Sequence, residues 1–308
     1  MKRFSTGSKN NLSSFVLTGP TGSGKTQFIL DHYSDEAEVI SIDSVMVYKG
    51  LDIGSSKPTK AERERVPHHL VDVLEIDEQM NLGMFLNLAQ QAAQVIQQKN
   101  KRMIVSGGTI YYLRHYLFGV PQTPKADLTI REKVNQLETE LGKEGLYQLL
   151  LQHDLTAGQK IHSNDIYRIK RALEVFFQTG HPLSSFSSMQ NETPNLPILI
   201  LDIEREELKK RIRERCLKMF DQGWVEEVQS VLKSYPEKNC PGLKSIGYAE
   251  ISRDLKQGKD PRNSIDEIIL RTYQLAKRQI TFLRSIKFAR WVSPRLEDVK
   301  RALFEFDS

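Results

Sequence analysis

An eight-residue stretch, GPTGSGKT at positions 19–26, constrains the fold more than any other part of the sequence. The apolar run 15–17 precedes it, and a helix is expected from residue 25 to about residue 33. A glycine-rich turn between a buried strand and a helix N-terminus directs backbone N–H groups and the helix dipole toward an anion. The stretch therefore predicts a phosphate-binding loop. The residues expected to hold phosphate are Gly19, Thr21, Gly22, Ser23, Gly24, Lys25 and Thr26.

Two side chains of this loop have separate expected roles. Lys25 supplies a mobile positive charge, and Thr26 can offer its hydroxyl to Mg²⁺, the cofactor that we expect. Two linked phosphates are enough to fill such a loop. The motif alone therefore leaves open whether it holds a nucleotide or a diphosphate ester.

The rest of the chain alternates strand and helix patterns before and after a helical stretch. Short apolar runs at 39–42, 102–105, 198–201 and 289–292 predict strands, and 85–99 and 110–119 have the composition of helices. This order predicts an α/β fold, a P-loop NTPase-like parallel sheet flanked by helices. Residues 121–196 show no strand pattern, and 184–197 read as a linker. We expect a catalytic core from 1–120 and 197–308 and an all-helical insertion domain from 121–196.

Composition restricts the class of protein and its compartment. The 308 residues carry a net charge of +5 and a pI of about 9.0, which only weakly favours a polyanionic partner. Cys216 and Cys240 have no zinc-ligand spacing, and no run of about 18 apolar residues occurs. We expect a cytoplasmic protein that does not associate with membranes and acts as a monomer.

Asp43 is the first acidic residue after the second expected strand, at the sheet edge where α/β proteins bind ligands. Three interpretations remain open for it. Asp43 can cap the following turn, hold magnesium, or act as a general base toward an acceptor molecule. A carboxylate is a weak base, but it can accept a proton that becomes acidic only as a new bond forms.

Beyond the phosphate loop, a series of motifs resembles the tRNA dimethylallyltransferases over nearly the whole chain. The segments that carry the resemblance are SIDSVMVYKGLDIGSSKP at 41–58, VPHHLVDV at 66–73, VSGGTIYYLRHYLFG at 105–119, IHSNDIYRIKRALEVFFQTG at 161–180, RIRERCLKMFDQGWVEEV at 211–228, SIGYAEI at 245–251 and TYQLAKRQITFLR at 272–284. Because the two cysteines exclude the zinc finger of the eukaryotic members, the chain resembles the bacterial type.

The resemblance implies a reaction and its catalytic residues. Members of the family transfer the dimethylallyl group of dimethylallyl diphosphate to N6 of the adenosine 3′-adjacent to the anticodon. It implies Asp43 as the base, Thr109 between donor and acceptor, and Arg215 on the diphosphate. Magnesium is implied at Thr26, with Asp43 as a possible second ligand. From the residues alone, Thr109 is equally a helix N-cap and Arg215 a solvated side chain of a charged helix.

The resemblance also implies contacts with the tRNA anticodon stem-loop. The implied residues are Asp43, Ser44, Val45, Met46, Arg131, Tyr167, Arg168, Ile169, Lys170, Arg171, Lys244, Ser245, Ile246, Gly247, Tyr248, Ala249, Lys277 and Arg278. Segment 271–290 contains six basic residues and no acid, which suits contact with a phosphate backbone. Met46, Ala249 and Tyr273 depart from the family pattern, where Gln, a basic residue and Arg are usual.

Two other functions are compatible with parts of the sequence. A P-loop kinase or NTPase would use ATP, and the segment ILILD at 198–202 resembles a strand that ends in a magnesium carboxylate. A non-catalytic RNA-binding module would keep the fold with a decayed site. Binding of ATP without tRNA distinguishes the first alternative, and the retained Lys25, Asp43 and Arg215 argue against the second.

Overall fold

The computed structural model describes residues 14–120, 123–124, 127–186, 196–236 and 239–307. The chain divides into two compact units: Met1–Leu117 with Thr193–Ser308, and Phe118–Glu192. Most of the linker expected at 184–197 lies outside the described residues. None of the described helices is long and apolar enough to cross a membrane.

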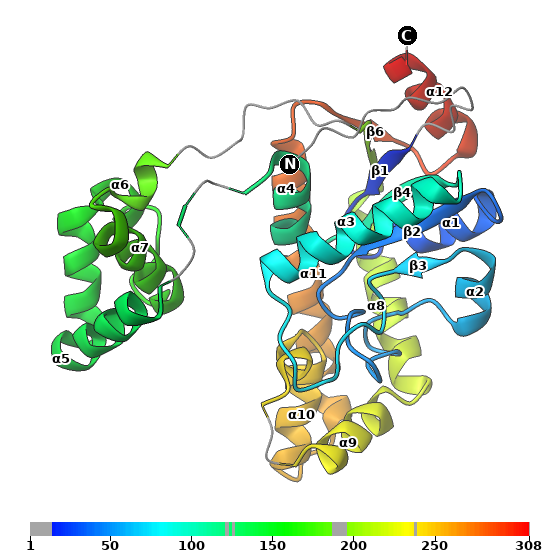
Figure 1. Ribbon diagram of the computed structural model, residues 1–308. Coiled ribbons are helices and arrows are strands. Elements are labelled where there is room, and N and C mark those ends of the chain that lie inside the picture. The colour runs from blue at the N-terminus through cyan, green and yellow to red at the C-terminus, as the bar shows by residue number, and fades with distance from the viewer. Residues whose placement is uncertain (1–13, 121–122, 125–126, 187–195, 237–238, 308) are drawn as a thin grey trace. The chain divides into compact units, whose positions relative to one another are not determined.

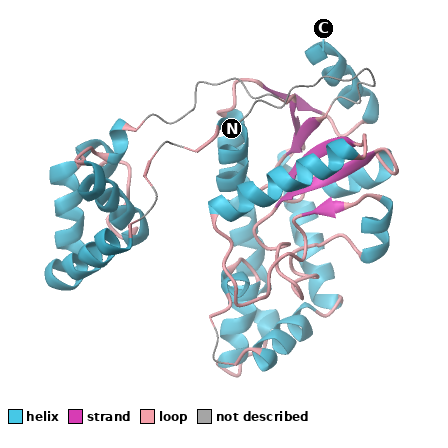
Figure 2. Ribbon diagram, viewed as in Figure 1, coloured by secondary structure: helices cyan, strands magenta, loops and turns pink. Residues whose placement is uncertain are grey.

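The larger unit is built on a parallel sheet of six strands in the order β3-β2-β4-β1-β5-β6 (Figures 1 and 2). The strands are β1 (Phe15–Thr18), β2 (Ala37–Ile42), β3 (His68–His69), β4 (Arg102–Gly107), β5 (Ile198–Leu201) and β6 (Ala289–Val292). The predicted α/β fold is confirmed. Only β3, a two-residue edge strand, was not expected from the sequence, because it is too short to show a periodic pattern.

Most of the helices were expected in outline, although α2 (Lys60–Arg65) was not expected, and the structure gives the bounds of all of them. They are α1 (Lys25–His32), α2 (Lys60–Arg65), α3 (Leu82–Gln98), α4 (Ile110–Phe118), α5 (Leu128–His153), α6 (Leu155–Gly158), α7 (Ile166–Thr179), α8 (Arg205–Asp221), α9 (Trp224–Ser234), α10 (Tyr248–Lys256), α11 (Ile265–Arg284) and α12 (Leu296–Asp307). Short 3₁₀ turns lie at Leu183–Ser185, Pro241–Lys244 and Pro261–Ser264.

Helices cover both faces of the sheet because its strands are apolar on both sides, as in most parallel sheets. On one face, α1 and α12 bury Phe28, Ile29 and Leu303 against alternate residues of β1 and β5. Helix α3 packs against β2 and β4. A second pair of helices, α8 and α11, packs through a cluster that includes Leu208, Ile212 and Ala276. This pair places α8 beside the loop that follows β1.

The smaller unit consists of three helices around its own core. Helices α5 and α7 pack through Val134, Leu146, Leu150 and Leu173, all fully buried. Aspartates cap all three helices: Asp127, Asp154 and Asp165 each accept a backbone N–H from the first turn. Gly142, with φ of 68°, introduces a kink into α5. The described part of this unit is all-helical.

Candidate active site

The carboxyl ends of β1, β2 and β4 meet at one edge of the sheet. Thr18 and Ile42 are both in register with Gly107, so the segments after the three strands start at the same level. Thr18 donates its hydroxyl proton to the Gly107 carbonyl at 2.8 Å, and the Thr109 N–H donates to the Ile42 carbonyl at 3.2 Å. The sheet thus brings the phosphate loop, Asp43 and the GGT segment 107–109 together.

The phosphate loop has its lysine folded back on itself. Lys25 Nζ donates to the carbonyl oxygens of Gly19 and Pro20, each at 2.9 Å. Burial, with the nearby Arg215 cation, lowers the pKa of Lys25 to about 8, and Asp43 opposes this shift. Lys25 Nζ also lies 3.4 Å from the Ser23 hydroxyl, so neutral dipoles are its recorded hydrogen-bond partners, and an anion in the loop would find an undercompensated charge beside it.

Asp43 uses one carboxylate oxygen for its own loop. Oδ1 accepts the backbone N–H groups of Val45 at 2.8 Å and Met46 at 3.0 Å. Oδ1 therefore acts as the cap of the following turn, which was one of the interpretations of Asp43. Oδ2 has no hydrogen-bond partner that we identify among the described residues, and Asp43 lines the cavity described below. One oxygen fixes the orientation of the carboxylate, and the other is free to accept a proton or to contact a cation.

Thr109 is the link between the GGT segment and the residue after Asp43. Its Oγ1 accepts the Ser44 backbone N–H at 3.1 Å and lies 3.3 Å from the Ser44 hydroxyl. The Leu113 N–H reaches the Thr109 carbonyl at 3.0 Å, so Thr109 occupies the position just before the first residue of α4. Its backbone thus starts the helix, and its hydroxyl contacts Ser44 on the Asp43 side.

Arg215 projects from α8 toward the phosphate loop. Its Nη2 donates to Oγ1 of Thr21 at 2.7 Å, and its side chain lines the cavity. Burial lowers the pKa of Arg215 and the Asp43 carboxylate opposes the shift, although the guanidinium remains a cation. The interpretation as a solvated side chain is wrong for Arg215. Its neighbours Arg213 and Glu214 on the same helix are the exposed ones.

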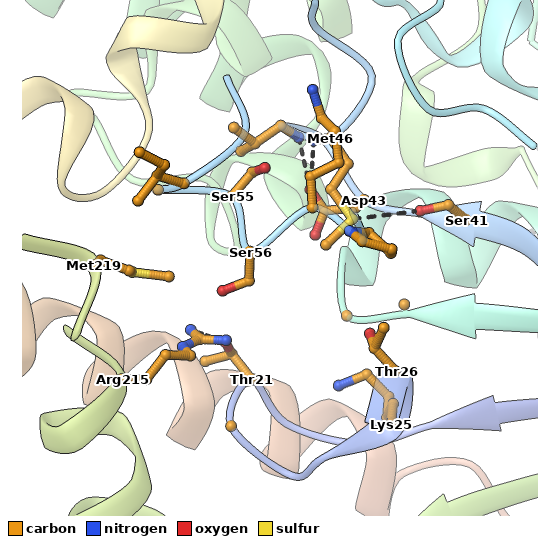
Figure 3. Close-up of a pocket in the computed structure, with 18 of the residues that line it drawn as sticks. Thr21, Lys25, Thr26, Ser41, Asp43, Met46, Ser55, Ser56, Arg215 and Met219 are labelled. Carbon is orange, nitrogen blue, oxygen red and sulfur yellow. Dashed lines mark hydrogen bonds between the residues drawn. The ribbon is translucent and has the colours of Figure 1, made fainter. Parts of the chain in front are cut away.

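One cavity of about 1360 Å³ includes all of these groups. Figure 3 shows Asp43 and Met46 across this cavity from Lys25, Thr26 and Arg215. Lys25, Thr26 and Arg215 carry cationic or hydroxyl groups, and Asp43 on the opposite side carries the carboxylate. The arrangement suits an anionic group at the phosphate loop and a proton donor at Asp43, with the reacting atoms between them.

The cavity also offers oxygen ligands for a magnesium ion. No group of three or more His, Cys, Asp or Glu side chains that could hold a metal occurs among the described residues. Magnesium usually keeps several waters and takes only one or two protein oxygens together with substrate phosphates. Thr26 and Asp43 both line the cavity beside the phosphate loop and fit that pattern. The donor set therefore suits a magnesium ion that arrives with a diphosphate.

The far wall of the cavity is formed by residues of the connection 43–75, which contains the short elements α2 and β3 and is called the 43–75 loop. Two clusters of charged residues hold this connection in place. The Glu227 carboxylate of α9 accepts the backbone N–H groups of Asp52 at 2.8 Å and Ile53 at 2.7 Å, and the Tyr248 hydroxyl at 2.6 Å. Lys57 is buried between Asp52 and Asp72. These anchors were not predicted from the sequence, although the DIG…KP motif contains their partners.

The KSIGYA segment, residues 244–249, borders the cavity only in part. Lys244, Ser245 and Ile246 line the cavity, and Lys244 is exposed. Gly247 is buried against the Trp224 ring, and Tyr248 is 1% exposed with its hydroxyl bound to Glu227. The Tyr248 side chain supports the 43–75 loop and is not available to RNA. Ala249 is half-buried.

Lys277 and Arg278 of α11 are exposed, as surface contacts must be. The Lys277 ammonium lies 5.3 Å from the centre of the Tyr273 ring. Tyr273, which stands where the family pattern has Arg, also accepts a 2.7 Å hydrogen bond from Arg205 Nε. The Tyr273 side chain therefore contacts two cationic side chains, Lys277 at its ring and Arg205 at its hydroxyl.

In the insertion unit, the expected RNA contacts differ in exposure. Tyr167 is 83% exposed, and the Arg168 side chain is also exposed. Ile169 is fully buried in the core of the unit, so its side chain is not a surface contact. All four basic residues of this set are paired with acids: Arg131 and Arg171 contact Glu174, Lys170 contacts Glu138, and the exposed Arg168 contacts Asp165.

A phosphate loop on a parallel sheet, with a facing carboxylate and an arginine from a flanking helix, defines the chain as a P-loop α/β protein built for group transfer. Residues 46–286 match the family described as IPP transferase. The chain belongs to the IPP transferase family. The resemblance noted in the sequence is thereby confirmed.

Curated relatives and solved structures agree with this assignment. A protein of Borrelia hermsii named tRNA dimethylallyltransferase is 36% identical, with 96% of this chain and 99% of the relative covered. The crystal structure titled tRNA delta(2)-isopentenylpyrophosphate transferase from Staphylococcus epidermidis is 28% identical, with a TM-score of 0.65 and coverage of 96% and 98%. A eukaryotic dimethylallyltransferase, described as acting on tRNA, shares the fold at 24% identity and a TM-score of 0.76.

Proposed function

We propose that the protein transfers the dimethylallyl group of dimethylallyl diphosphate to N6 of the adenosine 3′-adjacent to the anticodon in tRNA. The products are N6-isopentenyladenosine and diphosphate. The observation that carries the proposal is the placement of Lys25, Arg215, Thr109 and Asp43 around one cavity, in a member of the IPP transferase family. The names of the relatives support the choice of tRNA and of the prenyl donor.

On the donor side, the phosphate loop would hold the diphosphate. Cleavage of the allylic C–O bond leaves negative charge on that group, and the Lys25 and Arg215 cations would stabilise it. Lys25 must leave the carbonyl oxygens of Gly19 and Pro20 to reach a phosphate oxygen. Thr26 and Asp43 are the residues that would hold a magnesium ion, which would supply further positive charge to the leaving group.

On the acceptor side, the adenine would enter as a base removed from its stack. Its exocyclic N6 is a poor nucleophile because the lone pair is delocalised into the ring. As the N–C bond forms and the C–O bond breaks, the amine becomes acidic and Asp43 Oδ2 accepts its proton. The Val45 and Met46 N–H groups hold Oδ1, so the carboxylate keeps its orientation during the transfer.

All of the proposed catalytic side chains come from one unit of one chain, which supports action as a monomer. The reaction is proposed to take place in the cytoplasm, because the proposed substrate is a tRNA. RNA contacts are proposed at the exposed Lys244, Lys277 and Arg278 and at Tyr167 and Arg168 of the insertion unit.

The proposal is tested by incubating the protein with labelled dimethylallyl diphosphate and unmodified tRNA, followed by nucleoside analysis. We expect label in N6-isopentenyladenosine at the position after the anticodon. A kinase or NTPase would instead bind ATP tightly without tRNA and leave adenosine unprenylated. That result would contradict the proposed function.

A further inference from the structure

A buried glutamine on α11 joins the two halves of the candidate site. Gln279 is 4% exposed and uses both ends of its side-chain amide. Its Oε1 accepts the Thr21 backbone N–H at 2.8 Å, and its Nε2 donates to the Gly108 carbonyl at 2.7 Å. Thr21 belongs to the phosphate loop and Gly108 to the GGT segment. Gln279 therefore bridges two loops that would hold different substrates.

The GGT segment has a glycine that permits this bridge. A Cβ atom on Gly108 would lie 2.5 Å from Nε2 of Gln279, which is closer than any Cβ contact allows. Any larger residue at 108 would push the glutamine away or displace the loop. The middle glycine of GGT is thus explained by the approach of Gln279, not by its own backbone conformation.

The bridge is the central link in a series of hydrogen bonds across the cavity, which are connected through covalently bonded neighbours. Arg215 donates to the Thr21 hydroxyl, and the Thr21 N–H donates to Gln279. Gln279 donates to Gly108, whose neighbour Thr109 accepts the Ser44 N–H. Ser44 directly follows Asp43. These contacts therefore lead from the Arg215 guanidinium, on the side of the prenyl donor, to Ser44, which adjoins Asp43 on the side of the adenine.

We propose that Gln279 is a positioning residue that sets the spacing between the diphosphate cradle and the acceptor-side residues Thr109 and Asp43. The inference rests on the proposed function, in which a carbon on one side must meet a nitrogen on the other. Transfer rates depend steeply on such spacing, and a misplacement of about 1 Å can lower a rate about 100-fold. Gln279 contacts neither expected reacting group and acts through the two loops.

This role differs from the one expected for segment 271–290 as a whole. Lys277 and Arg278 are exposed, whereas Gln279 is 4% exposed, lines the cavity, and has both ends of its amide hydrogen-bonded to backbone groups of the protein. A change at Gln279 should therefore alter the rate of transfer without altering the affinity for tRNA. A change at a residue that contacts RNA would instead alter the affinity for tRNA and not the rate of transfer.

The first experiment compares Gln279→Met with a matched control. Methionine preserves the length of the side chain and removes both hydrogen bonds. The control is Gln91→Met, an exposed glutamine on α3 away from the cavity. We expect kcat for prenyl transfer to fall about 10- to 100-fold in Gln279→Met. The Kd for tRNA should stay within about twofold of wild type, and the control should match wild type in both measurements.

Three results would each have a clear meaning. Transfer by Gln279→Met within about threefold of wild type would overturn the positioning role. A loss confined to tRNA affinity would also overturn it, in favour of an RNA contact. If the wild-type protein itself makes no isopentenyladenosine, the proposed function fails, which differs from failure at Gln279 alone.

A second variant tests the bridge through pH and remains decisive if the methionine variant does not fold. In Gln279→Glu, a carboxylate can accept from Thr21 but cannot donate to Gly108. The protonated carboxyl regains the donor. We expect the activity of Gln279→Glu, divided by that of wild type at each pH, to rise as pH falls from about 8 to 6, because burial favours the neutral acid. A ratio that does not change with pH would overturn the proposal.

Discussion

Arg215 and Thr21 are joined by a 2.7 Å hydrogen bond, although 194 residues separate them in the chain. The Arg215 guanidinium of α8 is therefore held on the phosphate loop by a contact within the protein. Fixing the cation in advance lowers the ordering cost when a diphosphate binds.

Thr21→Val tests the value of this docking, because valine keeps the shape and removes the acceptor. We expect kcat to fall by about 5- to 10-fold as Arg215 loses its fixed position. Thr139→Val is the matched control, since the Thr139 hydroxyl donates within its own helix to the Asn135 carbonyl. Steady-state kinetics that leave Thr21→Val equal to this control would show that the hydrogen bond does not position the arginine.

Asp43→Ala should remove the proton acceptor. We expect a loss of at least about 100-fold in kcat, the range typical of a lost general base, with tRNA affinity nearly unchanged. Asp31→Asn, an exposed acid on α1, should behave as wild type. Single-turnover transfer of labelled prenyl group and tRNA binding by fluorescence anisotropy separate the two effects. A near wild-type rate in Asp43→Ala would exclude Asp43 as the base.

The part of the site that could be predicted from the sequence is the part carried by local motifs at strand ends. Asp43 and Thr109 follow apolar runs directly, so sheet geometry alone brings them to the phosphate loop. Gln279 was missed because its partners lie 258 and 171 residues away. A signal was nevertheless present: Ala276, Gln279 and Leu283 form the buried stripe of α11, and a lone amide on such a stripe indicates a specific internal partner.

Lys25 gives a prediction about pH. Its pKa is lowered to about 8, so above that pH the free protein increasingly carries a neutral amine in the phosphate loop. A bound diphosphate favours the ammonium form. We therefore expect pyrophosphate binding to weaken as pH rises from 7 to 9, and to take up protons near pH 8. Calorimetry in two buffers of different ionisation enthalpy measures this uptake.

Lys25→Arg is the control for that measurement. Arginine stays charged across the range, whereas the ionisation of pyrophosphate itself is common to both proteins. The proton uptake near pH 8 should disappear in the variant. Equal uptake by both proteins would assign the proton to the ligand instead of to Lys25.

Glu227→Gln should weaken the anchoring of the 43–75 loop, which forms one wall of the cavity. The carboxylate accepts the Asp52 and Ile53 N–H groups and the Tyr248 hydroxyl, and an amide cannot satisfy all of these donors. We expect the free energy of unfolding to fall by about 1–3 kcal/mol. Urea denaturation measures it, with the exposed neighbour change Glu226→Gln as control. A difference of less than about 0.5 kcal/mol between the two variants would contradict the anchoring role.

Lys277→Ala combined with Arg278→Ala should reduce the electrostatic part of tRNA binding. Each phosphate contact that is lost lowers the slope of log K against log salt by about 0.7 to 0.9, so the pair should remove about 1.5. Lys300→Ala with Arg301→Ala on α12 changes the net charge equally and serves as control. Because an effect of net charge alone would alter both double variants alike, a slope reduced only in the α11 variant assigns these two residues to the RNA footprint. An unchanged slope would remove them from it.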